Sequence, residues 1–366
     1  MVEAVKQIHR LDPSSHILAT APSNAAADLL ASRLIKHVPP SQLLRLHAPS
    51  RITSSIPEDV LAVSNLHRSS GSFSYPTVEV LAKYRVLVVT LVTAGRLVSG
   101  SFPSGHFSHV FIDEAGHAME PEAVIALAGI LTRESVDLRK SSIVLAGDPK
   151  QLGPVLRSPW AIKHGLGVSL LERLMEQAMY SKGDAGYDHR CITKLVRNFR
   201  SHEKLLRLPA RLFYNGELVA GADQMVVNSL LKWPGLPKLG FPMLFHGIVG
   251  QDLREERSPS FFNLEEVCTV VEYIEDLLST REFGIRVQQE IGVISPYRRQ
   301  VQIREKLKSK QLGDVTVGST EEFQGQERRV IIVSTVRSNP QYVYTDNQYK
   351  LGFLKNPKRF NVAITR

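Results

Sequence analysis

Two short apolar runs in the first half of the chain each end in polar residues that are able to do chemistry. Asp113 and Glu114 follow the run 109–112, and Asp148 and Gln151 follow the run 142–146. A carboxylate can hold a hydrated magnesium ion, and an adjacent glutamate can polarise an attacking water. A glutamine amide can hydrogen-bond to a terminal phosphate. Either turn alone fits an ordinary surface turn, but two such strand ends in succession favour a nucleotide site.

The residues around these turns predict the elements that must position them. The first half of the chain alternates apolar runs of strand length with helical patterns, which predicts βαβ units and a mostly parallel sheet. The expected strands are 16–21, 84–90, 109–112 and 142–146, and the expected helices are 1–10 and 25–35. Residues 45–80 are rich in Pro, Ser and His and have poor apolar periodicity, so they predict an insertion or a long surface loop.

The second half of the chain repeats this style. Its expected strands are 243–248, 290–295, 314–317 and 330–335, and its expected helices are 263–278 and 297–307. The segment 183–188 has the composition of a loop and marks the boundary between the halves. The sequence therefore predicts an α/β protein with mostly parallel sheets and two domains, 1–185 and 186–366.

The composition excludes several classes of protein. A length of 366 residues with 43% hydrophobic and 22% charged residues is typical of a globular protein of about two domains. Two cysteines cannot build a disulfide framework, and they cannot form a zinc site without several suitably placed histidines. The longest apolar stretch, 86–92, is far too short to span a membrane. The net charge of +9 is compatible with a polyanionic partner.

Eight segments, in order along almost the whole chain, resemble the motifs of superfamily 1 helicases. Asp113-Glu114-Ala115-Gly116 resembles motif II, and the segment 147–152 (GDPKQL) resembles motif III. Residues 21–24 resemble motif Ia, and residues 90–95 resemble motif Ib. Residues 195–202 resemble the segment that opens the second lobe. Motifs IV, V and VI correspond to residues 294–297, 319–327 and 359–366. The up-frameshift-like group, superfamily 1B, is the most similar large group. Longer strings such as EEFQGQER and LGFLKNPKRFNVAITR resemble the Armitage / Moloney leukaemia virus ten type of RNA helicase.

This resemblance implies an α/β fold of two RecA-like lobes of the P-loop NTPase type, with ATP and Mg²⁺ bound between them. Asp113 would be the magnesium ligand, Glu114 would position the attacking water, and Gln151 would sense the γ-phosphate. Arg200 and Arg366 would be arginine fingers, because a guanidinium stays charged and binds phosphate with two parallel hydrogen bonds. The other nucleotide contacts that the resemblance implies are Asp148, Phe199 (stacking on the base), Gly325 and Glu327 (approaching the ribose).

The resemblance also implies movement and unwinding along a single strand of RNA, 5′ to 3′, with DNA not excluded as the substrate. Partners in ribonucleoprotein or RNA-silencing complexes, a cytoplasmic location that includes ribonucleoprotein granules, and no association with a membrane are implied as well. The residues that would contact the nucleic acid are Pro22, Ser23, Asn24, Thr93, Ser295, Pro296, Thr320, Lys355, Lys358 and Arg359.

One motif of these helicases does not occur in the sequence. Motif I has the form G-x-x-x-x-G-K-[ST], and no such string is present. The segment 1–10 resembles the helix that follows that loop, so both lobes are expected to be incomplete at the chain ends. Two readings follow. The chain is a fragment of a working helicase and inactive alone, or it is a catalytically dead RNA-binding scaffold of the same fold. The intact Asp113, Glu114, Gln151, Arg200 and Arg366 favour the fragment.

Overall fold

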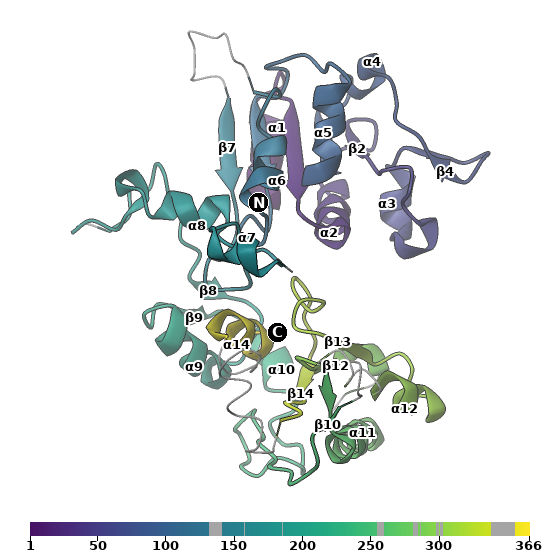
Figure 1. Ribbon diagram of the computed structural model, residues 1–366, viewed down its shortest axis with the longest axis vertical. Coiled ribbons are helices and arrows are strands. Elements are labelled where there is room, and N and C mark those ends of the chain that lie inside the picture. The colour runs from purple at the N-terminus through teal and green to yellow at the C-terminus, as the bar shows by residue number, and fades with distance from the viewer. Residues whose placement is uncertain are drawn as a thin grey trace. The chain divides into compact units, whose positions relative to one another are not determined.

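The computed structural model describes most of the chain and divides it into two compact units (Figure 1). Unit 1 is Met1–Ile192 and unit 2 is Thr193–Arg366, so the division falls a few residues beyond the predicted boundary at 185. The described residues are 1–131, 141–156, 158–184, 186–254, 260–280, 285, 287–297, 300, 303–337 and 356–366.

Unit 1 is built on a five-stranded parallel sheet whose strand order is β2-β5-β1-β6-β7. Ala19, at the middle of the central strand β1, lies opposite Val88 on one neighbour and Phe111 on the other. All four strands predicted in this half are confirmed, and β2 joins them at one edge. The strands are β1 (Ile17–Ala21), β2 (Leu43–Arg45), β5 (Val86–Thr90), β6 (His109–Ile112) and β7 (Ser142–Leu145).

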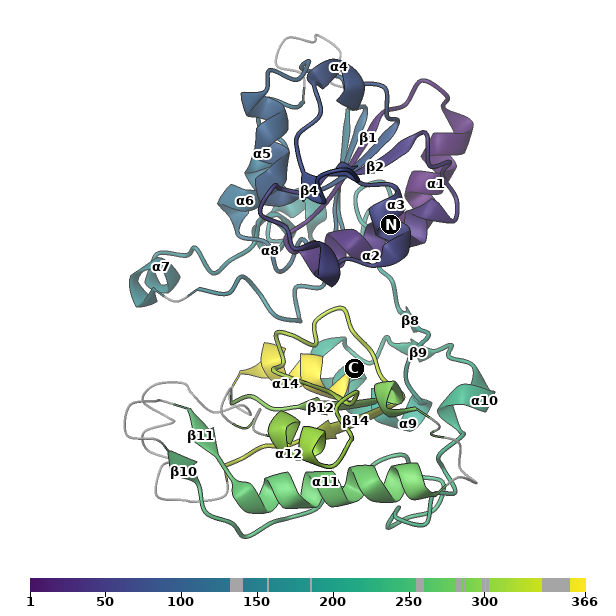
Figure 2. The ribbon, with the colours of Figure 1, turned by 90° about the vertical axis from the view of Figure 1, so that its right-hand side faces the viewer.

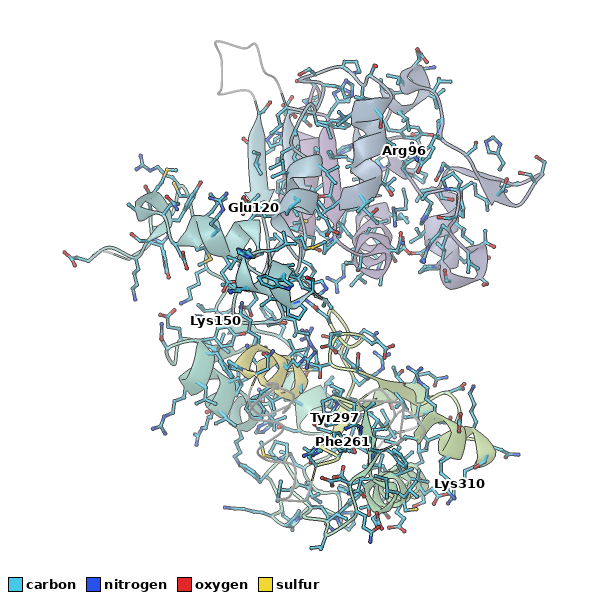
Figure 3. All side chains as sticks on the ribbon, viewed as in Figure 1. Arg96, Glu120, Lys150, Phe261, Tyr297 and Lys310 are labelled. Carbon is cyan, nitrogen blue, oxygen red and sulfur yellow. The ribbon has the colours of Figure 1, made fainter. Side chains whose placement is uncertain are left out.

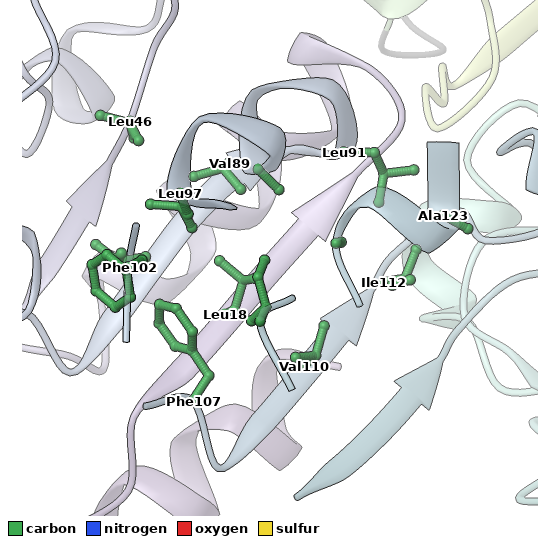
Figure 4. Close-up of a cluster of buried hydrophobic side chains, with 14 of the residues drawn as sticks. Leu18, Leu46, Val89, Leu91, Leu97, Phe102, Phe107, Val110, Ile112 and Ala123 are labelled. Carbon is green, nitrogen blue, oxygen red and sulfur yellow. The ribbon is translucent and has the colours of Figure 1, made fainter. Parts of the chain in front are cut away.

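Helices cover both faces of this sheet. Alternate strand residues point to opposite sides, and the apolar side chains on each side are buried under helices. Leu18, Leu87 and Val110 belong to one buried cluster together with α5, α6 and α8 (Figure 4). Ile17 and Val86 belong to a second cluster with α1, α2 and α3. The helices of unit 1 are α1 (Val2–Leu11), α2 (Asn24–Ile35), α3 (Glu58–Ala62), α4 (Val78–Leu81), α5 (Leu91–Ser99), α6 (Glu120–Ile125), α7 (Pro159–Lys163) and α8 (Leu170–Met175), with 3₁₀ turns η1 (Thr53–Ser55) and η3 (Ala178–Tyr180).

The expectation of a long surface loop at 45–80 is wrong, whereas that of an insertion stays a prediction. The segment follows directly from β2, contains α3 and α4, and forms a hairpin of β3 (Leu66–His67) and β4 (Ser72–Phe73). Val60 and Phe73 are buried in the cluster under α2. Asn65 donates its side-chain amide to the carbonyls of His47 and Ser74, at 3.0 and 2.8 Å. The segment is therefore an integral part of unit 1.

Unit 2 contains a smaller parallel sheet with the strand order β13-β12-β14. The longest helix among the described residues, α11 (Figure 2), begins after Asn263, whose side chain accepts a hydrogen bond from the backbone N–H of Glu266 at 3.0 Å. The predicted helix 263–278 is confirmed within one residue. The elements are β8 (Arg197–Asn198), α9 (Glu203–Phe213), β9 (Val219–Ala220), α10 (Gln224–Val227), β10 (Leu253–Arg254), β11 (Phe261–Phe262), α11 (Leu264–Ser279), η5 (Gln288–Glu290), β12 (Ile291–Ile294), α12 (Ile303–Ser309), β13 (Thr316–Gly318), β14 (Val330–Val333) and α14 (Pro357–Ile364).

Two predictions for unit 2 differ from the structure. The expected strand 243–248 is wrong, because these residues form no strand and the Phe245 side chain is 90% exposed. The expected helix 297–307 is described only from Ile303 onward as α12, and part of its first half lies outside the described residues. The strands 290–295, 314–317 and 330–335 are confirmed within one or two residues. The fold class, α/β with mostly parallel sheets, is confirmed. Within the described part of the chain, no helix is long and apolar enough to cross a membrane.

Candidate functional site

The predicted catalytic residues of unit 1 follow strands that lie side by side. β1 pairs with β6 and β6 pairs with β7, all in parallel, so the three strands end at one edge of the sheet. Pro22, Asp113 and Gly147 come at or just after these ends. The carboxyl edge of a parallel sheet is the usual place for a ligand in this class of fold. The predicted turns 113–116 and 147–151 are therefore neighbours at this edge.

The first turn holds its two carboxylates in a constrained backbone. The N–H of Asp113 donates to the carbonyl of Thr20 at 2.7 Å, which ties the turn to β1. Glu114 adopts a φ of +53°, in the left-handed region that costs a residue with a side chain about 1–2 kcal/mol. Burial and the neighbouring charge of Glu114 raise the pKa of Asp113 above its ordinary value. Strain and a raised pKa on adjacent acidic residues are typical of functional sites.

The two turns are in direct backbone contact, and glycines make this contact feasible. A Cβ atom on Gly147 would lie 2.7 Å from the backbone nitrogen of Gly116. A Cβ atom on Gly116 would lie 3.0 Å from the carbonyl oxygen of Asp148. In addition, the N–H of Ala115 donates to the carbonyl of Ala146 at 2.8 Å. Since no side chain fits between them, the turns form one rigid block.

Asp148 organises the second turn. One of its carboxylate oxygens accepts the backbone N–H of Lys150 at 2.9 Å, and the other accepts the side-chain amide of Gln151 at 2.9 Å. The amide that is predicted to sense a phosphate is thus held by the carboxylate three residues earlier. Lys150 extends from the same turn (Figure 3).

The donor set of this edge fits a magnesium ion better than a metal held by protein groups alone. Among the described residues no cluster of three His, Cys, Asp or Glu side chains is able to hold a metal. Magnesium usually takes only one or two carboxylates and completes its shell with water and substrate phosphates. Asp113 offers one such carboxylate, and a cation there would favour its charged form against the burial and the Glu114 charge that raise its pKa.

The nucleic-acid residues predicted in unit 1 differ in accessibility. Ser23 and Asn24 are exposed where β1 leads into α2, and Pro22 is half-buried. The Ser23 hydroxyl caps α2 by accepting the N–H of Ala26 at 3.2 Å. Thr93 is only 8% exposed, and its hydroxyl accepts a hydrogen bond from Thr90 at 2.8 Å. Asn24 is therefore the most available side chain of this group.

Three predicted segments of unit 2 meet at Arg200. Its Nε donates to a carboxylate oxygen of Glu327 at 2.5 Å, and its Nη1 donates to the carbonyl of Thr365 at 3.1 Å. Arg366 follows Thr365 directly and is half-buried. Phe199, beside Arg200, is 71% exposed, as a ring that stacks on a base must be. The structure thus brings both predicted arginine fingers and the predicted ribose contact to one region of unit 2.

The other predicted residues of unit 2 are mostly buried or paired. Ser295 and Thr320 are fully buried, and Pro296 is half-buried next to Tyr297, whose ring meets Phe261 edge-on (Figure 3). Arg359 contacts the carboxylate of Glu321 at 2.8 Å. Three residues complete the set. Gly325 has a φ of +75°, Lys358 is half-buried, and Lys355 lies outside the described residues.

Sequence reasoning missed two residues that contact predicted site residues, Arg45 in unit 1 and Glu321 in unit 2. Arg45 is fully buried, and its Nη2 donates to the Oδ1 of Asn24 at 3.0 Å. The only sequence signal was a lone arginine inside the apolar run Leu43–Leu46, which is unusual for a surface loop. Glu321, the partner of Arg359, was also missed, since an acidic residue gives no sign of a partner 38 residues away.

Family profiles match most of the chain. A profile described as an AAA domain matches residues 166–366, which is more than half of the chain. A second profile, also described as an AAA domain, matches residues 65–159.

Several helicases of known name are similar over the whole length of the chain. It is 51% identical to "Putative helicase mov-10-B.1" of Danio rerio, covering 100% of this chain and 37% of that protein. It is 45% identical to "RNA helicase Mov10l1" of Homo sapiens, covering 100% of this chain and 30% of that protein. It is 33% identical to "Probable RNA helicase armi" of Drosophila melanogaster, covering 100% of this chain and 33% of that protein. The chain therefore spans less than half of the length of each of these relatives.

Solved structures give weaker matches. An arterivirus nonstructural protein 10 (helicase) in complex with DNA is 13% identical, with a TM-score of 0.40 over 100% of this chain and 55% of that one. A Pif1 helicase from Bacteroides is 14% identical, with a TM-score of 0.27 over 76% of this chain and 57% of that one. Because both TM-scores are low, the assignment to a family rests on the sequence matches.

Proposed function

This chain belongs to the superfamily 1B helicases of the Armitage and MOV-10 type, and we propose that it forms the core that couples ATP hydrolysis to 5′-to-3′ movement on single-stranded RNA. One observation carries the proposal. The turn of Asp113 and Glu114 is packed through glycines onto the turn of Asp148 and Gln151. The two turns that carry the carboxylate proposed to activate water and the amide proposed to sense phosphate are thus packed together at one sheet edge.

The residues divide the work of hydrolysis among them. Glu114 would orient the attacking water and accept its proton, and Gln151, held by Asp148, would bond the terminal phosphate. Asp113 would hold Mg²⁺, which supplies charge neutralisation at the phosphate oxygens. Arg200 and Arg366 would stabilise the charge that develops on the phosphate. Arg200 is paired with Glu327, and nucleotide binding would exchange that carboxylate for phosphate or ribose.

Glu114→Gln tests the catalytic assignment. The 366-residue sequence has no G-x-x-x-x-G-K-[ST] loop to grip the β- and γ-phosphates, so we expect almost no RNA-stimulated ATP hydrolysis from it. The measurement is made in parallel on a version extended at its N-terminus by a strand and such a loop. We expect this version to hydrolyse ATP, and Glu114→Gln to lower its kcat by about 100-fold or more.

An exposed glutamate of the same unit gives the matched control. Glu79→Gln, on α4, removes the same charge without touching the sheet edge and should leave kcat unchanged. Turnover that survives Glu114→Gln would reject the role given to Glu114. Full turnover by the unextended chain would show that the missing loop is not needed.

A second candidate function is a catalytically dead RNA-binding scaffold of the same fold. The sequence, which contains no G-x-x-x-x-G-K-[ST] string, leaves this alternative open. The two candidates separate in the experiment above. The scaffold predicts RNA binding without hydrolysis even in the extended version, whereas the helicase core predicts both.

We further propose that this protein acts in RNA silencing, with ribonucleoprotein partners, in the cytoplasm and its ribonucleoprotein granules. Support comes from the family to which the chain belongs, and from relatives named RNA helicases. The tagged protein should then co-purify with proteins that are released by ribonuclease treatment. A purely nuclear signal in fluorescence microscopy would contradict the proposed location.

A further inference from the structure

A buried ionic network lies directly beneath the start of α2. The Arg45 side chain is completely buried, and its Nε donates to Oδ1 of Asp28 at 2.8 Å. Its Nη1 donates to the carbonyl of Leu46 at 2.9 Å, and its Nη2 donates to Oδ1 of Asn24 at 3.0 Å. The second oxygen of Asp28 accepts from Arg51 at 2.9 Å. Each nitrogen of the Arg45 guanidinium therefore has an acceptor.

The chemistry of arginine fixes which way the Asn24 amide points. A guanidinium has donors only, whereas a side-chain amide has an oxygen that accepts and a nitrogen that donates. The atom of Asn24 that faces Arg45 must therefore be the oxygen. The NH₂ group is then directed away from Arg45, on a residue that is exposed where β1 leads into α2.

A donor at this position suits one part of a nucleic acid. Phosphate oxygens only accept hydrogen bonds, so an outward NH₂ matches them and an outward carbonyl does not. We propose that Arg45 is a positioning residue of the nucleic-acid site, which holds the Asn24 amide with its donors toward a phosphate of single-stranded RNA. This inference rests on the proposed RNA binding, and adds a buried residue that acts on RNA only through Asn24. The alternative is that Arg45 merely anchors the segment 45–55.

Two substitutions at exposed Asn24 test the direction of the amide. Asn24→Ala removes the donors, and should weaken binding of a labelled single-stranded oligouridine about fivefold in fluorescence anisotropy. In Asn24→Asp one oxygen replaces the atom that faces Arg45, and the other places a negative charge where the donors were. Asn24→Asp should bind the oligouridine about tenfold more weakly than Asn24→Ala. This difference in affinity should become smaller as salt is added, because salt screens the added charge. Binding by Asn24→Asp equal to or tighter than that of Asn24→Ala would overturn the proposal.

A double-mutant cycle tests whether Arg45 acts through Asn24. Arg45→Lys keeps the charge but loses the fork that reaches Asp28, Leu46 and Asn24 together. It should weaken RNA binding in the wild-type background, and cause no further loss in the Asn24→Ala background. A further loss in that background would show that Arg45 acts on RNA by another route, and would reject the positioning role.

Arg51→Lys is the matched control. Arg51 also contacts Asp28, but none of the hydrogen bonds or ion pairs of the described residues joins it to Asn24, so RNA affinity should stay within about twofold of wild type even if the melting temperature falls. Equal losses of RNA affinity in Arg45→Lys and Arg51→Lys would mean that Arg45 only anchors the segment 45–55.

If Arg45→Lys does not fold, the comparison of the RNA affinities of Asn24→Asp and Asn24→Ala decides. A wild-type chain that binds no RNA rejects the proposed RNA binding, whereas a binding wild type with unaffected variants rejects only this inference.

Discussion

At the scale of single residues, Asp113 is held in a state that disfavours its charge. Its pKa is raised first by burial and then by Glu114. A carboxyl whose pKa is higher in the folded than in the unfolded protein binds protons more tightly when folded. Its contribution to stability is therefore present at low pH and is lost as the pH rises through the folded pKa. At neutral pH the ionised Asp113 lowers the free energy of unfolding.

Asp113→Asn should accordingly stabilise the metal-free protein. We expect the melting temperature at pH 7 to rise by a few degrees, and the gain to disappear as the pH falls toward the ordinary range of a carboxyl, about 4. Thermal unfolding followed by circular dichroism in chelator at several pH values measures this.

Asp188→Asn is the control of opposite sign for that experiment. Hydrogen bonds from Arg190 lower the pKa of Asp188 to about 2, so its substitution should not raise the melting temperature at pH 7. A stabilisation by Asp113→Asn that is the same at every pH would contradict the argument from its pKa.

At the scale of elements, the block formed by the two catalytic turns depends on Gly147. A Cβ atom there would meet the backbone nitrogens of Gly116 and Ala115 at 2.7 and 3.1 Å. Backbone cannot rotate out of the way as the end of a side chain does. We expect Gly147→Ala to lower the free energy of unfolding by about 2 kcal/mol, as for other overpacked sites, in urea denaturation.

Gly167→Ala, in the same unit, is the matched control. Its added methyl would meet only the end of the Leu156 side chain, at 3.7 Å, and Gly167 has no positive φ. The midpoint of its urea transition should stay close to that of wild type. Equal effects of the two substitutions would mean that the contact between the turns is not tight in solution.

The sequence predicted the elements well where burial and polarity agree. The strands β1, β5 and β6 are apolar runs that are buried in the structure, so their pattern was readable. The segment 45–80 was misread because its core includes polar residues such as Arg45 and Asn65. A pattern that equates polar with exposed cannot detect buried charges that find partners after folding. The strand predicted at 243–248 was wrong for the opposite reason, because an apolar residue of this run, Phe245, is exposed.

The candidate site was predictable to a similar degree. Parallel strands end at one edge, so the proximity of the Asp113 and Asp148 turns followed from their place after strands. The contact of Arg200 with Glu327 joins residues 127 positions apart, and no periodicity encodes it. The burial of Thr93, Ser295 and Thr320 could not be predicted either, because small hydroxyl residues occur both inside and outside proteins.

At the scale of the whole molecule, two units with separate cores share a net charge of +9. Binding to RNA that relies on cations releases counterions from the strand, so affinity should fall steeply with salt. We expect the logarithm of the association constant to fall linearly with the logarithm of the salt concentration, with a slope of about −0.7 for each phosphate contacted. Anisotropy titrations between 50 and 200 mM salt measure it. An affinity that does not change with salt would contradict a phosphate-binding surface.

The contact between Gly116 and Gly147 also constrains how such a protein can change over time. A Cβ atom at Gly147 would lie 2.7 Å from the backbone of the other turn, and one at Gly116 would lie 3.0 Å from it, so replacing either glycine requires the partner turn to move. A lineage that substitutes one of them must shift the other turn in the same history, or lose the close packing of the two turns. The two glycines are therefore expected to behave as one inherited character, although 31 positions of sequence separate them.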